Sequence, residues 1–356
     1  MQVSSSVTGD SKPLSAGSTA MISNALDPPP DEGIKKCAQQ LAVLLAEKGA
    51  IVYRIRQDAP FVARKLLASP QLLRTLRKNR VRVVVYVPTQ SATLGSLVRS
   101  TVLRLLVGVK VVLLALQARD LRKVPPVLAT YLRPDLVLTP SPSMLRAAER
   151  CGLKAAEVPL GVDLDRFQPV SPGRKLELRE KYALPAQHPI VLHVGHASRR
   201  RGLDWITRLS PDIVRIVVIG RSLGLDQHVV EVLRGSGIRV FDRYMPEIHE
   251  LYQLADVYAF PVRHEQAAIA APLSVLEAMA CNLPVVSTSY GALPQMLVEG
   301  TGLFFTEDEL HFRAGVAAAL DMPRDEVRTR EQVLRYGWTA AGDAVLQAAI
   351  DLCRRT

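Results

Sequence analysis

The stretch that decides the fold covers residues 257–289 and reads VYAFPVRHEQAAIAAPLSVLEAMACNLPVVSTS. It begins with one short run of β-branched and aromatic residues, VYAFPV, and ends with another, LPVVSTS. Between them, LSVLEAMA has the composition of a buried helix. We expect this helix to begin near Pro272 or Leu273, because proline suits a first helical turn. Strand, helix and strand in this order predict a βαβ unit with two parallel strands.

The same alternation continues on both sides of this stretch. The other apolar runs are AMISNAL, AIVYRI, VRVVVYVP, KVVLLAL and DLVLTPS in the first half of the chain, and IVLHVG, VRIVVIG and IRVFDR in the second. Helical patterns fill the gaps between them, for example GIKKCAQQLAVLLAEK before Gly49, a suitable C-cap. We therefore predict an α/β protein in which the strands of each sheet run parallel.

The alternation is interrupted once, around VPLGVDLDRFQPVSPG. We predict two Rossmann-like, doubly wound lobes with a cleft between them, over residues 21–165 and 166–340. Residues 1–20 are Ser/Thr/Gly-rich and predict a disordered leader, and residues 341–356 predict a C-terminal helix that packs back on the first lobe. Ligands of such sheets bind outside the carboxyl ends of the strands.

Length and composition agree with two globular lobes. The chain has 356 residues, of which 48% are hydrophobic and 22% charged, which excludes a wholly disordered protein. The four cysteines form no CxxC pair, so neither a disulfide framework nor a zinc site is indicated. Residues 102–117 are the most apolar run but contain Arg104 and Lys110, so no membrane span is predicted. We expect a cytoplasmic protein, peripheral on the inner face of the membrane.

The charge is distributed unevenly. The net charge is +11, and residues 1–170 hold 24 Lys and Arg against 12 Asp and Glu, so the whole surplus lies in the first half. Residues 60–82 and 95–110 place arginines and lysines beside leucines at helical spacing. Such helices either lie on an anionic bilayer or bury their leucines in the core and expose their arginines to solvent. We expect an anionic membrane surface as partner and no nucleic acid, because aromatics that would stack on bases are sparse.

A candidate phosphate site follows the strand IVLHV. The motif VGHASRRRG joins a glycine turn to three arginines before a helix that we expect near Leu203. Backbone N–H groups at such a turn, together with the planar guanidinium fork, suit phosphate oxygens. The candidate residues are Gly195, His196, Arg199 and Arg201. The alternative is a solvated basic loop, since the motif is neither a Walker loop nor GxGxxG.

A second candidate site is the start of the helix LSVLEAMA. The N–H groups of Leu273 and Ser274 would face the cleft at the positive end of the helix dipole. Glu277 lies one turn further on, where its carboxylate could accept the two hydroxyls of a ribose or simply complement the dipole. In VPLGVDLDRF, Asp163 or Asp165 is interpreted as a helix cap rather than a metal ligand.

These motifs together resemble glycosyltransferase family 4, the glycosyl transferases of group 1. VPLGVDLDRF resembles the family's VIPNGVDxxxF segment, and VGHASRRRG resembles its VGRLxxxKG loop. LSVLEAMACNLPVVSTSYGALPQML resembles its donor-site helix and the strand that follows, and the resemblance covers about residues 135–305. It implies the GT-B fold and a retaining transfer of sugar from a UDP- or GDP-sugar to a glycan or lipid-linked acceptor. It also implies that no metal or cofactor is needed, the nucleotide-sugar being a co-substrate.

The resemblance also assigns roles on the donor side. Arg201 takes the position of the family's phosphate-binding lysine, and His196 takes that of its phosphate-binding arginine. Glu277 takes the ribose-binding second Glu of the E-x7-E motif. The first Glu, which touches the donor sugar, falls on Ile269. Counting from the strand end instead makes Glu265 the sugar-contacting residue.

On the acceptor side the resemblance is looser. DEGIKK replaces the family's Gly-rich first loop and makes Gly33, Lys35 and Lys36 acceptor-side candidates. Where the family has a histidine near the anomeric carbon, this chain has Gln117 or Arg119. These departures leave a second hypothesis, a catalytically impaired GT-B protein that binds a nucleotide-sugar or a partner transferase. A GT-B epimerase is disfavoured by the GVD and LEAMA motifs.

Overall fold

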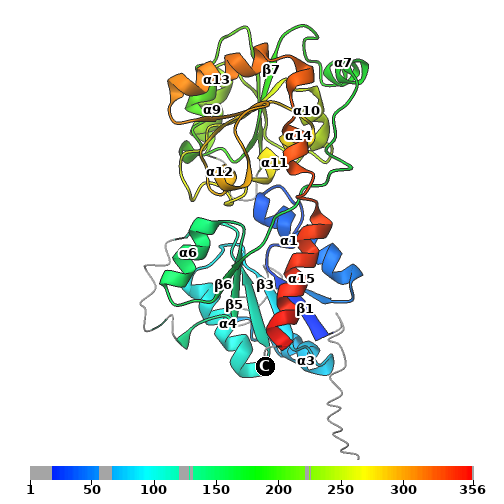
Figure 1. The fold of residues 1–356 in the computed structure, drawn as a ribbon, viewed down its shortest axis with the longest axis vertical. Coiled ribbons are helices and arrows are strands. Elements are labelled where there is room, and N and C mark those ends of the chain that lie inside the picture. Colours follow the sequence, from blue (N-terminus) through cyan, green and yellow to red (C-terminus); the bar gives the residue numbers. More distant parts are fainter. Residues whose placement is uncertain are drawn as a thin grey trace, which may run out of the picture.

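The computed structural model describes residues 18–55, 66–119, 128, 131–220, 224 and 226–354. It consists of two α/β lobes stacked end to end (Figure 1), each built on a six-stranded sheet in which all strand pairs are parallel. The predicted fold class is thereby confirmed. Of the predicted leader, residues 1–17 lie outside the described residues, and its last two residues already belong to the first strand.

The first lobe has the sheet order β2-β1-β3-β4-β5-β6. Five of the six strands match predicted apolar runs. The sixth strand, β6, has the sequence AAE and contains no β-branched residue from which a strand could be predicted. The strands are β1 (Thr19–Ser23), β2 (Ile51–Arg54), β3 (Val83–Val87), β4 (Lys110–Leu114), β5 (Leu136–Thr139) and β6 (Ala155–Glu157), and the helices are α1 (Gly33–Glu47), α3 (Pro70–Lys78), α4 (Leu94–Val107) and α6 (Pro142–Arg150).

The second lobe has the sheet order β12-β11-β10-β7-β8-β9, so the strand order reverses between β7 and β10. Loops on the two sides of such a reversal leave a crevice at the carboxyl edge of the sheet. The strands are β7 (Ile190–Gly195), β8 (Val214–Ile219), β9 (Arg239–Phe241), β10 (Val257–Phe260), β11 (Val285–Thr288) and β12 (Leu303–Thr306).

The helices of the second lobe cover both faces of its sheet. They are α7 (Pro172–Lys181), α8 (Asp204–Thr207), α9 (Gln227–Gly235), α10 (Ile248–Leu254), α11 (Leu273–Ala280), α12 (Leu293–Met296), α13 (Glu309–Asp321) and α14 (Thr329–Val333), with the short 3-10 helices η3 (Arg199–Arg201) and η4 (Arg324–Glu326). Helix α11 begins directly after Pro272, as predicted, and nearly all of its residues are buried because its sequence is apolar on every side.

The chain passes between the lobes twice, and the two connections lie side by side. Val162, on the way out, forms a parallel bridge with Gly337, on the way back. The returning chain continues as α15 (Trp338–Arg354), which packs on α1 of the first lobe. Lys48 and Asp343 form an ion pair of 2.6 Å in this contact. The helix thus begins at Trp338, three residues before the predicted boundary.

Within the described residues, none of the helices combines the length and the apolar character that crossing a membrane requires. The same part of the chain contains no cluster of His, Cys, Asp or Glu suited to a metal ion. All four cysteines are free thiols.

Candidate functional site

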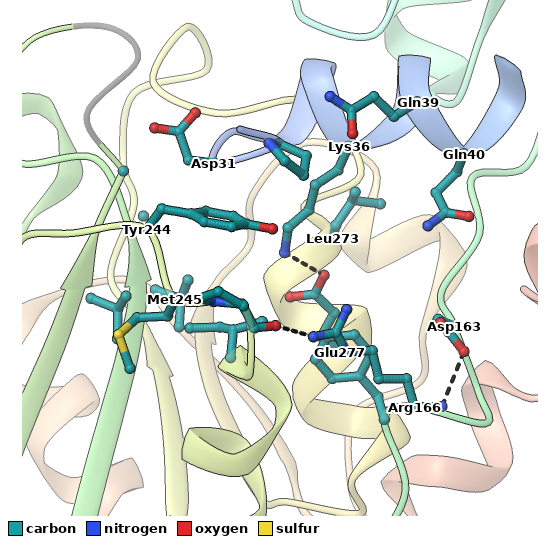
Figure 2. Close-up of a pocket in the computed structure, with 18 of the residues that line it drawn as sticks. Asp31, Lys36, Gln39, Gln40, Asp163, Arg166, Tyr244, Met245, Leu273 and Glu277 are labelled. Atoms are coloured by element: carbon teal, nitrogen blue, oxygen red, sulfur yellow. Dashed lines mark hydrogen bonds and ion pairs between the residues drawn. The ribbon is translucent and has the colours of Figure 1, made fainter. Parts of the chain in front are cut away.

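A cleft lies between the lobes, at the carboxyl ends of β7 and β8 (Figure 2). Its cavity measures about 140 Å³. Helix α1 closes it from the side of the first lobe, and α11 and the loop after β9 close it from the second. The residues that matter most for its chemistry are Lys36, Gly195, Gly220, Tyr244, Leu273 and Glu277.

Arg201 does not itself line the cavity but lies buried next to Gly195, which does, and only 6% of Arg201 is exposed. Its guanidinium packs against Gly195, so closely that a Cβ on Gly195 would collide with it. Nε is buried without a hydrogen-bond partner, and among the described residues no carboxylate pairs with this side chain. Burial lowers the pKa of Arg201, but arginine stays protonated. A buried cation without a counter-ion is costly unless a ligand supplies the anion.

The other two arginines of the motif are placed differently. Arg199 and Arg200 are exposed on η3, whereas Arg201 is turned inward. The basic loop therefore divides into two solvated side chains and one buried cation. Arg201 stays the candidate phosphate ligand, and the role of the exposed Arg199 stays a prediction.

Two histidines beside Arg201 are neutral. Burial and the nearby Arg201 charge lower the pKa of His193 to about 3 and that of His196 to about 4. His193 Nδ1 lies 2.8 Å from the carbonyl oxygen of Ala259, which makes Nδ1 the protonated nitrogen. His196 therefore does not supply the positive charge of the arginine whose position it takes.

These two pKa values predict a pH-dependent stability. Both imidazoles are neutral in the folded protein but bind protons in the unfolded chain below its pKa of about 6.5. The free energy of unfolding should therefore fall as the pH is lowered from about 6.5 towards 4. Thermal melts across this range should show a smaller fall for His193→Asn, which keeps an N–H near Ala259 but has no titrating ring. An equal fall in both proteins would contradict the assignment.

Glu277 is buried on α11 and both of its oxygens have partners. The Tyr252 hydroxyl donates to Oε2 at 2.9 Å, and Lys36 Nζ of the first lobe donates to Oε1 at 2.7 Å. Tyr252 is fully buried, so it fixes the carboxylate, whereas Lys36 reaches it from α1 across the cleft (Figure 2). A diol that binds Glu277 must share or replace the Lys36 contact.

The start of α11 offers backbone donors. The N–H groups of Val275 and Leu276 bond to the Pro272 carbonyl, whereas those of Leu273 and Ser274 bond to no carbonyl in the described structure. Pro272 provides no side-chain cap. Leu273 lines the cavity, so these N–H groups and the helix dipole add to the positive potential at this wall of the cleft.

The predicted sugar-side residues form contacts between the lobes. Gln117 donates through Nε2 to the Gln266 carbonyl at 2.6 Å, and its Oε1 accepts from Arg119 at 2.9 Å. The Ile269 side chain lies against Gly33 at the start of α1. Glu265 is exposed on the loop after β10. Its role at the sugar stays a prediction.

Two other predicted residues are used structurally. Lys35 is buried, and its Nζ lies 3.7 Å from Oδ1 of Asp31, four residues earlier in the chain. This ion pair ties the first turn of α1 to the segment that precedes it. Asp163 accepts from the Arg166 N–H at 3.0 Å in a turn, and no helix follows it. The helix-cap interpretation was wrong in that respect, since the side chain closes an isolated turn.

Sequence reasoning missed Tyr252, His193 and Tyr244, and it placed Lys36 on the other side of the cleft. His193 lies inside the apolar run IVLHVG and Tyr252 lies outside the named runs, and nothing in the spacing of either residue marked it. Lys36 was assigned to the acceptor side, although it contacts Glu277, the carboxylate predicted for the donor side. Tyr244 lines the cleft from the loop after β9 and is 40% exposed, which only the folded lobe reveals.

Comparison with known proteins shows which part of the chain is similar to a known family. Residues 188–322 match the family model "Glycosyl transferases group 1". A D-inositol 3-phosphate glycosyltransferase of Xylanimonas cellulosilytica is 30% identical over 220 residues, which cover 56% of this chain and 51% of that protein. A GDP-mannose-dependent alpha-(1-6)-phosphatidylinositol monomannoside mannosyltransferase of Mycolicibacterium smegmatis is 31% identical over 170 residues, 44% of each chain. The chain thus spans about half the length of the curated relatives that it matches.

The likeness in structure extends over both lobes. The Anabaena protein HepE, solved in complex with UDP, superposes with a TM-score of 0.68 at 16% identity, covering 93% of this chain and 98% of that one. At this identity the likeness concerns the fold alone. The protein thus has the GT-B fold, and its residues 188–322 carry the predicted resemblance to the glycosyl transferases of group 1.

Proposed function

We propose that the protein is a retaining, metal-independent glycosyltransferase that moves a sugar from a UDP- or GDP-sugar to a glycan or lipid-linked acceptor. The observation that carries the proposal is Arg201, which is buried against Gly195 and pairs with no carboxylate among the residues that the structure describes. Relatives named for transfer to inositol phosphate and from GDP-mannose, and a structural neighbour crystallised with UDP, support the class of donor.

The charges explain how this site would act. When the bond between the sugar and the diphosphate breaks, negative charge grows on the leaving phosphate. Arg201 and the N–H groups of Leu273 and Ser274 are fixed before the reaction begins, so they stabilise this charge without reorganising. An acceptor hydroxyl that attacks from the face of the leaving phosphate needs no protein nucleophile.

Glu277 would hold the nucleotide through its ribose. Tyr252 fixes one carboxylate oxygen, and the other is turned to the cleft, where Lys36 now contacts it. A ribose diol offers two donors to such a carboxylate. Lys36 then lies where it can contact the bound donor, which gives this acceptor-side lysine a part in closing the lobes over the substrate.

The second hypothesis, an impaired GT-B protein that binds a nucleotide-sugar, has an observation in its favour. Ile269 occupies the position of a sugar-contacting Glu and packs on Gly33, and Gln117 is engaged by Gln266. Both proposals predict donor binding, but only the first predicts turnover.

A thermal-shift screen against UDP, GDP, ADP and their sugars tests donor binding. We expect one nucleotide to raise the melting temperature, and Glu277→Gln to weaken its binding about ten-fold by losing a charge-assisted bond. Glu299→Gln, on the loop before β12, is the control. Donor hydrolysis and transfer, measured with and without EDTA, then separate the two hypotheses. No stabilisation by any nucleotide would overturn both, and loss of activity in EDTA would overturn metal independence.

A further inference from the structure

We propose that the edge of the first sheet farthest from the cleft is a docking surface for an anionic lipid bilayer. The strands of this sheet are parallel and their carboxyl ends face the cleft, so the turns before them share the opposite edge. Figure 1 shows α3, α4 and the end of α15 at this extreme of the molecule, away from the second lobe. We call this edge the basic edge.

Positive side chains occupy the turns that precede four neighbouring strands. Arg80 and Arg82 precede β3, Lys110 begins β4, Arg133 precedes β5, and Lys154 precedes β6. Because neighbouring strands lie about 4.8 Å apart, these charges form a row. In these turns (79–82, 108–110, 132–135 and 152–154) Asp135 is the one acidic residue, and it is already paired with Arg104 and Lys110.

Apolar side chains project from the same edge. Leu105 is 80% exposed, Tyr131 is 73% exposed and Leu106 is 42% exposed. Two hydrogen bonds place them among the charges: Arg77 Nη2 donates to the Leu106 carbonyl at 2.6 Å, and Arg104 Nη1 donates to the Arg133 carbonyl at 2.9 Å. We call Leu105, Leu106 and Tyr131 the apolar tip.

The combination favours a bilayer over a nucleic acid. The basic row matches any polyanion, but exposed leucines beside it gain free energy only where they leave water, as in the acyl boundary of a membrane. Tyrosine is a preferred residue at that interface. An acceptor carried by the same bilayer must extend past the height of the sheet, about 17 Å for a five-residue strand, to reach the cleft.

This inference names the membrane partner of the proposed function, and it rests on that proposal only for the reason why a membrane is useful. Its test is flotation of the full chain with vesicles of phosphatidylcholine, with and without phosphatidylglycerol, at low and high salt. Donor and acceptor are absent from this assay. We expect binding to the anionic vesicles alone and its loss at high salt, because salt screens charges outside the protein.

Two variants locate the surface. In Arg80→Gln/Arg133→Gln/Lys154→Gln the altered side chains have no hydrogen bond or ion pair in the described part of the chain, so the fold should be kept. Binding should weaken about 100-fold, since each charge near the surface contributes about five-fold. Leu105→Ser should weaken it about ten-fold. The control is Leu310→Ser/Arg313→Glu on α13, where both residues are exposed.

The outcomes distinguish failure of the docking surface from failure of the proposed enzyme activity. Absence of wild-type binding to anionic vesicles, equal binding to neutral ones, or unchanged binding of both variants would each overturn the docking surface. Binding of duplex DNA that the triple variant loses, with no vesicle binding, would make the partner a nucleic acid and also overturn it. Vesicle binding without sugar transfer would leave the surface standing and remove only the proposed enzyme activity.

Discussion

Replacing Arg201 by methionine should lower the rate of sugar transfer by about two to three orders of magnitude and leave the fold at least as stable as the wild type. In the proposed function, the loss of rate follows from removing a fixed positive charge near the point where the leaving phosphate would develop its negative charge. The gain in stability follows from removing a buried cation that has no partner among the described residues, at about 1–2 kcal/mol.

Arg215 provides the matched control. It is a buried arginine of the same lobe, but it donates to the carbonyls of Thr207 at 3.0 Å and Ser236 at 2.9 Å. Arg215→Met should therefore lower the melting temperature and leave transfer by the folded fraction unchanged. Initial rates of sugar transfer and thermal melts of both variants test whether Arg201 acts in transfer or in stability. If Arg201→Met transfers sugar at the wild-type rate, or if it unfolds, Arg201 is a structural residue.

Gly161→Ala should destabilise the protein by about 3 kcal/mol, the upper part of the range for overpacked sites. A Cβ at Gly161 would lie 2.5 Å from the Cα of Trp338 and 2.7 Å from its backbone nitrogen. These are backbone atoms of the returning connection, so a side-chain rotation does not relieve the collision. The two connections must separate, which strains the bridge between Val162 and Gly337.

Gly173→Ala is the control for this prediction. Gly173 lies in the first turn of α7, and an added Cβ there meets no atom within 4 Å. This substitution should be neutral or slightly stabilising, because it reduces the entropy of the unfolded chain. Urea unfolding of both variants measures the difference. A stable Gly161→Ala protein would show that the connections separate freely.

Much of the fold was predictable because parallel strands buried on both faces are continuous apolar runs. The start of α11 was predictable because proline fixes the backbone there. β6 was not predicted, because Ala-Ala-Glu is as compatible with helix as with strand. Its three residues are held in the sheet by the neighbouring β5.

The candidate site was predictable where one segment contains both the turn and the ligand, as in VGHASRRRG. Which arginine turns inward was not predictable, since Arg199, Arg200 and Arg201 are alike in sequence and differ only in burial. The neutral state of His196 depends on neighbours brought in by folding, and the Lys36 to Glu277 contact depends on how the lobes meet.

The paired connections have a consequence for the architecture. The second lobe begins and ends at neighbouring points, because Val162 and Gly337 are bridge partners. Topologically it is therefore an insertion within the first lobe, because α15, which follows the second lobe in the chain, packs on α1 of the first lobe. An insertion with adjacent ends can be exchanged as one unit, so the donor lobe of another GT-B protein could be grafted between these two residues without breaking the contact of α15 with α1.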